Sequence, residues 1–293
     1  MAVSLSRRAF VAGAVGAGAL GAAGVGLGVA GLRHHLDRLV HPVPEPAYTL
    51  PPREASIVSG SFVSQARGGR RVGWSIAYPD TTRRGLPVAI VLHGRGDDHG
   101  TVFGSHAWGR YLVAAVEAGV PPFAVAAADG GDHGYWHRRA DGDDPQLMLL
   151  TEFVPLLAEH GLRTRSFGLA GWSMGGYGAL LLAERIGRAH CAAVAVDSPA
   201  LWPKSADSAP GAFDNVADFS GHDVIANRGR LSGIPLRVAI GTSDPFYATT
   251  RRFVAELSPR PSVDFSRGGH DVAFWRHSAP HQLAFLGAHL HGV

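Results

Sequence analysis

The sequence Gly171-Trp172-Ser173-Met174-Gly175 lies between a short apolar run, residues 167–170, and a longer helical pattern, residues 177–183. The first run predicts a buried strand, and the second predicts the helix that follows it. A sharp turn from strand to helix exposes the serine hydroxyl, and the flanking glycines relieve the crowding that such a turn creates. Because the chain contains 39 glycines, G-x-S-x-G alone could arise by chance, so the strand and helix carry the prediction. Ser173 is therefore the predicted nucleophile.

Outward from this turn, short apolar runs alternate with longer helical patterns, which indicates an α/β layered domain. Residues 87–92 are apolar throughout, as expected of a strand buried on both faces. We predict one catalytic domain, residues 55–293, with a doubly wound and mostly parallel sheet whose functional groups gather at the C-terminal strand ends. The predicted strands are 57–65 and 71–78 (an antiparallel edge pair), 87–92, 123–128, 166–171, 191–196, 236–240 and 262–265, and the predicted helices are 108–117, 147–160, 176–186, 249–257 and 272–290.

Asp244 and His270, both later in the chain than Ser173, complete a candidate catalytic triad. A serine hydroxyl is unreactive until a base takes its proton, and an acid must orient that base. Asp244 follows the predicted strand 236–240, and His270 follows the predicted strand 262–265. Taken singly, Asp244 could be a turn former and His270 a helix cap, but the order serine, acid, histidine at three strand ends predicts a triad. The reserve acids, none of which directly ends a strand, are Asp218, Asp223 and Asp264.

Two backbone amides are expected to stabilise an oxyanion near Ser173. One is the N–H of Met174, directly after the nucleophile, and the other is the N–H of Arg95, in the loop after the predicted strand 87–92. We expect the Arg95 side chain to reach only solvent. His93 could be read as a second base, but a structural histidine beneath this loop is the favoured interpretation.

Six segments outside the nucleophile turn also bear on the family of the chain: Leu92-His93-Gly94, Asp129-Gly130-Gly131, Tyr135-Trp136-His137, Gly176-Tyr177-Gly178-Ala179-Leu180, 241–246 and 269–275. Together with that turn they resemble the esterase branch of the α/β-hydrolases, which includes esterase D-like enzymes and the antigen 85 mycolyltransferases. The resemblance covers nearly all of residues 70–290 and implies an α/β-hydrolase fold, ester hydrolysis or acyl transfer through an acyl-serine, and no metal or organic cofactor. The mycolyltransferases have a glutamate as the acid, so Asp244 favours the esterases.

Two aromatic residues are candidates for the substrate pocket. Trp136 follows one predicted strand end, and Trp202 follows the predicted strand 191–196 and could shape an acyl pocket. A structured loop is an equal alternative for the segment that contains Trp136. Residues 203–233 have mixed polarity and no strong periodicity, and their position suits a small lid. Histidine-rich pieces such as His222-Asp223 lack zinc-ligand spacing, so no metal is predicted.

The N-terminus predicts export. Arg7-Arg8 precede an uncharged, Gly/Ala-rich stretch, Ala9–Leu32, which resembles a twin-arginine signal. A general secretory signal and an uncleaved anchor are the alternatives, because this stretch is long enough to span about 30 Å of bilayer. Residues 1–32 are thus an export signal or anchor that allows membrane association, and residues 33–54 form a proline-rich linker.

Composition excludes several other classes of protein. The formal net charge is +3, and arginines occur singly or in pairs without a basic stripe, so no nucleic-acid partner is expected. The single cysteine, Cys191, lies in an apolar run and cannot form an intramolecular disulfide. The leading interpretation is an exported esterase that acts on small-molecule or lipid esters. The alternatives are a cell-envelope acyltransferase with the same triad and a non-catalytic binding protein.

Overall fold

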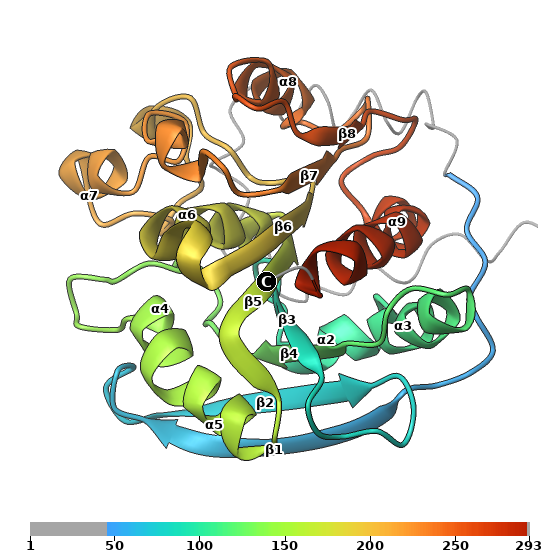
Figure 1. Ribbon diagram of the computed structural model, residues 1–293. Helices are drawn as coiled ribbons and strands as arrows, with labels where there is room; N and C mark the ends of the chain where they lie inside the picture. Colours follow the sequence, from blue (N-terminus) through green and yellow to red (C-terminus); the bar gives the residue numbers. More distant parts are fainter. Residues whose placement is uncertain (1–45, 292–293) are drawn as a thin grey trace, which may run out of the picture.

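The computed structural model describes residues 46–291, and an eight-stranded sheet forms its centre (Figure 1). The strand order is β1-β2-β4-β3-β5-β6-β7-β8; β2 pairs antiparallel with both of its neighbours, and all other pairs are parallel. The predicted doubly wound, mostly parallel sheet is therefore confirmed. The strands are β1 (Ser56–Ser64), β2 (Arg70–Tyr78), β3 (Pro87–Leu92), β4 (Ala124–Ala128), β5 (Arg163–Trp172), β6 (Cys191–Asp197), β7 (Leu236–Ala239) and β8 (Ser262–Asp264).

Helices cover both faces of the sheet (Figure 1). Helices α3 and α9 pack together on one face, and α4, α5 and α6 lie on the other. The α-helices are α2 (His99–Phe103), α3 (Trp108–Glu117), α4 (Pro145–Met148), α5 (Val154–Glu159), α6 (Met174–His190), α7 (Val216–Gly221), α8 (Tyr247–Ala255) and α9 (Val272–Leu290), joined by the π-helical turn η1 (Leu149–Phe153) and the 3₁₀ turns η2 (Ser205–Asp207) and η3 (Arg228–Leu231).

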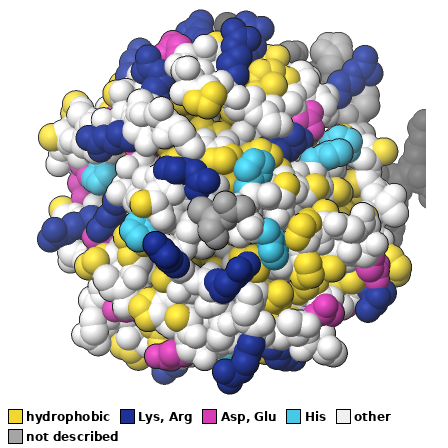
Figure 2. Space-filling view, viewed as in Figure 1, with side chains coloured by type: hydrophobic (Ala, Val, Ile, Leu, Met, Phe, Trp, Pro, Cys, Tyr) yellow, Lys and Arg dark blue, Asp and Glu magenta, His cyan; other side chains and the backbone are white. Residues whose placement is uncertain are grey.

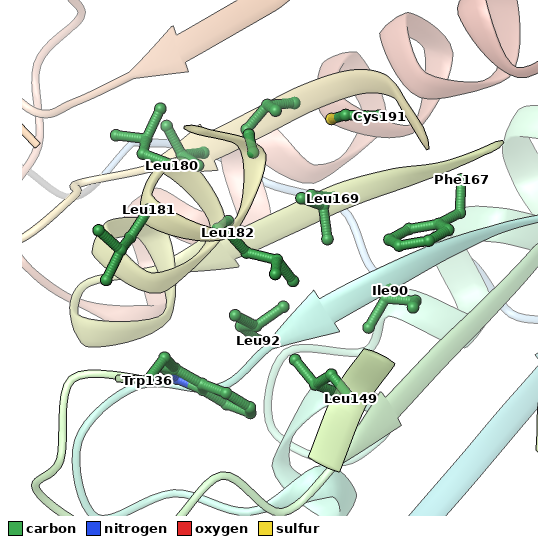
Figure 3. Close-up of a cluster of buried hydrophobic side chains, with 14 of the residues drawn as sticks. Ile90, Leu92, Trp136, Leu149, Phe167, Leu169, Leu180, Leu181, Leu182 and Cys191 are labelled. Atoms are coloured by element: carbon green, nitrogen blue, oxygen red, sulfur yellow. The ribbon is translucent and has the colours of Figure 1, made fainter. Parts of the chain in front are cut away.

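Each face of the sheet has its own apolar core. On the α6 side, leucines of α6 meet side chains of β3 and β5, such as Ile90 and Leu169 (Figure 3). On the other side, Trp108 of α3 and Phe274 of α9 pack against small residues of the central strands. The strands β3, β4 and β6 are buried along their whole length, which explains why they are continuous apolar runs in the sequence.

The chain reverses its winding direction at β3. The connection from β3 leads to β4 on one side, and β5 then pairs with β3 on the other side. The C-terminal ends of β3 and β5 therefore flank a topological switch point, where open α/β sheets bind their ligands. The loops after β3, β4, β5, β6 and β7 meet at this edge.

Surface charge is dispersed on the face that Figure 2 shows. Lysine and arginine side chains are separated there by polar and apolar surface, in keeping with the scattered arginines of the sequence. Across residues 46–291, no helix combines the length and the apolar character needed to cross a bilayer. The predicted signal, residues 1–32, and most of the predicted linker, residues 33–54, lie outside the described residues.

Candidate active site

Ser173 occupies a strained position between β5 and α6. Its φ and ψ are 54° and −121°, values that a residue with a side chain rarely adopts. Hydrogen bonds hold this backbone: the Ser173 N–H donates to the carbonyl of Asp197 (3.1 Å), and the Ser173 carbonyl accepts from the amide of Ala200 (3.0 Å). The end of β6 thus fixes the turn that presents the Ser173 hydroxyl.

The two glycines of the turn are required for space. A Cβ atom at Gly175 would lie 1.9 Å from the carbonyl oxygen of Leu92, at the end of β3. A Cβ atom at Gly171 would lie 2.5 Å from the carbonyl group of Gly175. The glycines therefore relieve crowding at the turn, as predicted, and much of that crowding comes from the close approach of the α6 N-terminus to β3.

The structure brings Ser173, His270 and Asp244 into one hydrogen-bonded relay. The Nε2 atom of His270 lies 2.9 Å from Ser173 Oγ, and its Nδ1 atom lies 2.8 Å from Asp244 Oδ2. Since the carboxylate accepts a hydrogen bond from Nδ1–H, the Nε2 lone pair is directed to the serine hydroxyl. Asp244 is 4% exposed, and its other oxygen accepts the Phe246 amide (2.8 Å), so the carboxylate is held in place. This geometry suits removal of the Ser173 proton by His270.

Aromatic rings hold the imidazole of His270 on two sides. Its ring centroid lies 5.4 Å from that of Phe246 and 5.2 Å from that of Trp275. Behind Trp275, the ring of His106 stacks on Trp172 of β5 at 3.8 Å. Burial lowers the pKa of His106 to about 3, so this ring is neutral at physiological pH. The stack links the strand that carries the serine to the loop that carries the histidine.

The reserve acids lie in other environments. Asp218 accepts the amide of Asp214, Asp223 accepts amides at the start of its own turn, and Asp264 pairs with Arg237 at 3.7 Å. Among residues 46–291, Asp244 is the carboxylate that hydrogen-bonds to His270.

Asp197 is a further buried acid that the sequence analysis did not single out. It is the last residue of β6, it is 1% exposed, and its Oδ1 accepts from Ser278 and from Gln282 (2.6 Å) of α9. Burial raises the pKa of this carboxyl to about 7. Its position could have been noticed in the sequence, because it is an acid at the end of the first strand after the nucleophile helix.

Both predicted oxyanion amides belong to the turns beside the serine. Met174 is the first residue of α6, where the N–H has no partner within the helix. Arg95 lies in the loop after β3, and within residues 46–291 neither its N–H nor that of Met174 donates to another group. The Arg95 side chain was expected to reach only solvent. This expectation is wrong, because its Nη2 donates to the carbonyl of Pro210 at 3.4 Å.

His93 is a structural residue, as predicted. Its Nε2 accepts the amide of Gly130 (2.9 Å), so its Nδ1–H donates to the carbonyl of Gly94 (2.8 Å). Burial lowers the pKa of this imidazole. His93 therefore ties the loop of Arg95 to the end of β4 in a neutral state.

The two tryptophans predicted for the pocket have different positions. Trp136 does not line a pocket: it is 1% exposed, lies in the α6-side core (Figure 3), and donates its indole N–H to the carbonyl of His93 (3.2 Å). Glycines at 130 and 178 leave room for its ring, which explains the burial of a loop residue. Trp202 is partly buried and packs on Phe246 at 4.8 Å, so it does lie beside the His270 side of the site.

A cavity lies on the side of the loop after β3 that carries Arg95. It measures about 550 Å³, and none of the three relay residues lines it. Its wall mixes arginines and aspartates, including Arg67, Asp97 and Asp129, together with His93. Trp202 and Phe246 contact the His270 side of the relay, whereas this cavity forms a separate polar volume.

Comparisons with solved structures identify the fold. A fluorophosphonate-binding serine hydrolase F from Staphylococcus aureus matches with a TM-score of 0.68 and 20% identity, over 80% of this chain and 99% of that one. An S-formylglutathione hydrolase from Agrobacterium tumefaciens matches with a TM-score of 0.67 and 14% identity, over 81% and 96% of the chains. The Mycobacterium tuberculosis protein MPT51 matches with a TM-score of 0.62 and 16% identity, over 84% and 99%. These similarities confirm the predicted α/β-hydrolase fold.

Family membership comes from the sequence itself. No curated protein matches the chain. Residues 65–286, which include both the nucleophile turn and the His270 loop, match the family described as "Putative esterase". The chain therefore belongs to this esterase family of α/β-hydrolases and is a carboxylic ester hydrolase.

Proposed function

We propose that the protein hydrolyses carboxylic esters through an acyl-serine intermediate on Ser173. The observation that supports this proposal is the relay in which His270 lies 2.9 Å from the serine hydroxyl and 2.8 Å from the Asp244 carboxylate. His270 takes the hydroxyl proton while Ser173 Oγ attacks the ester carbonyl, and the amides of Met174 and Arg95 stabilise the oxyanion. The imidazolium then protonates the leaving alcohol.

Deacylation repeats these steps with water. His270 takes a proton from water, the hydroxide attacks the acyl-serine carbonyl, and the proton returns to Ser173 Oγ as the acid leaves. Trp202 and Phe246 offer an apolar wall to the acyl group, since their rings pack at right angles beside His270. Small-molecule esters with an apolar acyl part fit this wall.

Acyl transfer to a sugar or lipid hydroxyl is the alternative, because the same acyl-serine serves both reactions. The fold similarity to MPT51 is compatible with it, whereas the acid Asp244 favours hydrolysis. Product analysis with a long-chain acyl donor, with and without a sugar acceptor, separates the two. A free fatty acid in both cases supports hydrolysis.

Replacement of the nucleophile tests the proposal. Ser173→Ala should lower kcat on p-nitrophenyl esters by about 10⁴ to 10⁶ and abolish labelling by a fluorophosphonate, because the alanine cannot form the acyl-enzyme. Ser232→Ala, at an exposed serine in a loop, should leave both unchanged. If Ser173→Ala retained a tenth of the activity, another nucleophile would be at work.

We also propose that the protein is exported by the twin-arginine route. The support is the pair Arg7-Arg8 before a weakly hydrophobic segment, residues 9–32, which lies outside the described residues. Replacing both arginines by lysine keeps the charge but removes the guanidinium pair, so folded, active enzyme should accumulate in the cytoplasm. Undiminished export of the Lys-Lys variant would exclude this route. Mass spectrometry of the exported form would then show cleavage near Ala30 or retention of an anchor.

A further inference from the structure

Three side chains from two separate segments place potential metal ligands close together, away from the serine relay. They are His137 in the loop after β4, Asp218 in α7, and His222 at the C-terminal end of α7. One nitrogen or oxygen atom of each lies within 4.8 Å of the other two. Asp218 Oδ1 is 3.0 Å from His222 Nδ1 and 3.7 Å from His137 Nδ1.

The surroundings of His137 favour a cation or a second proton at its ring. Its Nε2 atom lies 2.9 Å from the carbonyl oxygen of Ala212, and its Nδ1 atom lies 2.9 Å from the carbonyl oxygen of Arg138. A neutral imidazole carries one N–H, so one ring nitrogen must direct a lone pair toward oxygen. If Nε2–H donates to Ala212, the bare Nδ1 faces both the Arg138 carbonyl and Asp218.

A second proton is the less favourable solution. His137 is 1% exposed, and its ring stacks on that of His222, with centroids 4.2 Å apart and planes 28° apart. A full charge on a buried ring is costly, the adjoining imidazole offers it no compensation, and the Asp218 carboxylate lies 3.7 Å away, beyond hydrogen-bond distance. A divalent ion, in contrast, can take a lone pair from each imidazole and is partly neutralised by the Asp218 carboxylate. In the metal-free state the His222 Nδ1–H donates to the Asp218 carbonyl oxygen (2.9 Å), so metal binding would displace this proton to Nε2.

We propose that His137, Asp218 and His222 form a structural binding site for a divalent transition-metal ion of the zinc class. Imidazole nitrogen and carboxylate oxygen are ligands that zinc binds at about 2.0–2.2 Å, which places neighbouring ligands of a tetrahedron roughly 3.4 Å apart. The separations of 3.0 and 3.7 Å in the group lie on either side of this value. The fourth position opens toward His222, whose side chain is 29% exposed, so water can complete the tetrahedron.

The neighbours of the three ligands support the same assignment. The Ala212 carbonyl holds Nε2 of His137, and the amide of Asp214 donates to Asp218 Oδ2 at 2.8 Å. Such partners fix the orientation of metal ligands in proteins. No metal was predicted from the sequence, because histidines and acids that are close in sequence lack zinc-ligand spacing. Asp218 and His222 do form an i,i+4 pair, but only the fold brings His137 to them.

An ion here would fasten the segment between β6 and β7 to the loop after β4. The hydroxyl of Tyr177, one turn into the helix that begins after Ser173, donates to the carbonyl of His222. The ring of Phe213 stacks on His137 at 5.1 Å and contacts Tyr135. The ion would therefore stabilise residues 203–233 beside the ester site without touching the relay.

Metal titration of the full chain tests this site. EDTA-treated protein is titrated with Zn²⁺ against a chromophoric chelator and separately with Co²⁺, whose visible absorption reports tetrahedral coordination. The wild type should bind one equivalent and melt at a higher temperature with Zn²⁺ than without. His222→Ala and Asp218→Asn should each weaken binding by at least about tenfold. His133→Ala, an exposed histidine of the same loop as His137, is the matched control and should bind like the wild type.

Two outcomes would overturn the proposal. One is a wild type that binds neither ion above the level of the His222→Ala variant. The other is stoichiometric binding that survives both His222→Ala and Asp218→Asn, since the ion would then sit on other histidines, such as those at 34, 35 and 41. Melting curves without metal show whether each variant is folded, and Asp218→Asn preserves the side-chain shape if His222→Ala does not fold.

Discussion

Asp244 and Asp197 are buried aspartates at the ends of neighbouring strands, and their surroundings make them different groups. Asp244 accepts hydrogen bonds from the His270 imidazole and the Phe246 amide. Asp197 faces the neutral side chains of Ser278 and Gln282, and its burial raises its pKa to about 7. The first is placed to orient a base, and the second binds α9 to β6.

The acid can be tested at this scale. Asp244→Asn should lower kcat by about 10⁴ near neutral pH, because the amide can donate to Nδ1 and so favours the imidazole tautomer that cannot accept the serine proton. Steady-state kinetics on p-nitrophenyl acetate measure the effect. Asp264→Asn, which removes a carboxylate paired with Arg237 instead, should stay close to the wild-type rate. The reverse pattern would assign the acid to Asp264.

Among the helices and strands, long apolar patterns in the sequence were sufficient to predict the bounds of the long helices. Helices α3 and α9 have the predicted bounds, and the regular part of α6 ends at Gly187, where φ is 63°, one residue after the predicted end. The predicted helix 147–160 instead contains a π-helical turn, in which the Val154 amide donates to the carbonyl of Leu149. Pro155 has no N–H to continue the α-helical pattern, which explains the wider turn.

Short helices and loop packing were missed for a physical reason. The helices α2 and α7 are too short to show periodicity, although Asp98 and Asn215 cap them through side-chain oxygens. The triad could be predicted because each member follows a strand. The burial of Trp136 could not, because it depends on room left by Gly130 and Gly178, which only the fold brings together.

The contact between β3 and α6 gives a prediction for this pair of elements. Gly175→Ala should lower the unfolding free energy by more than about 3 kcal/mol or prevent folding, because the new Cβ meets the Leu92 carbonyl at 1.9 Å. Gly221→Ala, where a Cβ meets nothing within 4 Å, should change it by less than about 1 kcal/mol. Urea denaturation measures both. Equal stabilities of the two variants would mean that the turn between β5 and α6 tolerates a separation of α6 from β3.

For the molecule as a whole, two buried carboxyls make stability depend on pH. Burial raises the pKa of Asp197 to about 7 and that of Glu184, in α6, to about 8. Both folded-state values exceed those of the unfolded chain, about 4. The folded state therefore holds more protons in this range, so the stability that these groups contribute is complete below pH 4 and is lost as pH rises to about 8.

Asp197→Asn isolates half of this effect. The amide stays neutral and can still accept from Ser278 and Gln282. At pH 8 the unfolding free energy of the variant should therefore exceed that of the wild type by an amount on the order of a few kcal/mol, and at pH 4 the difference should be much smaller. Calorimetry across this range measures the difference. Asp207→Asn, where the side chain is 41% exposed, is the control. A parallel shift at every pH would show that Asp197 is not protonated on folding.

The three groups of the relay follow β5, β7 and β8, which all lie in the half of the sheet that the chain forms last. During synthesis the serine elbow leaves the ribosome long before residue 270 does, and domains generally fold as units. The hydroxyl of Ser173 then has no base until almost the entire chain is available. A nascent or truncated chain would be inert toward cellular esters, and covalent capture by a fluorophosphonate would report only molecules whose sheet is assembled as far as its last strand.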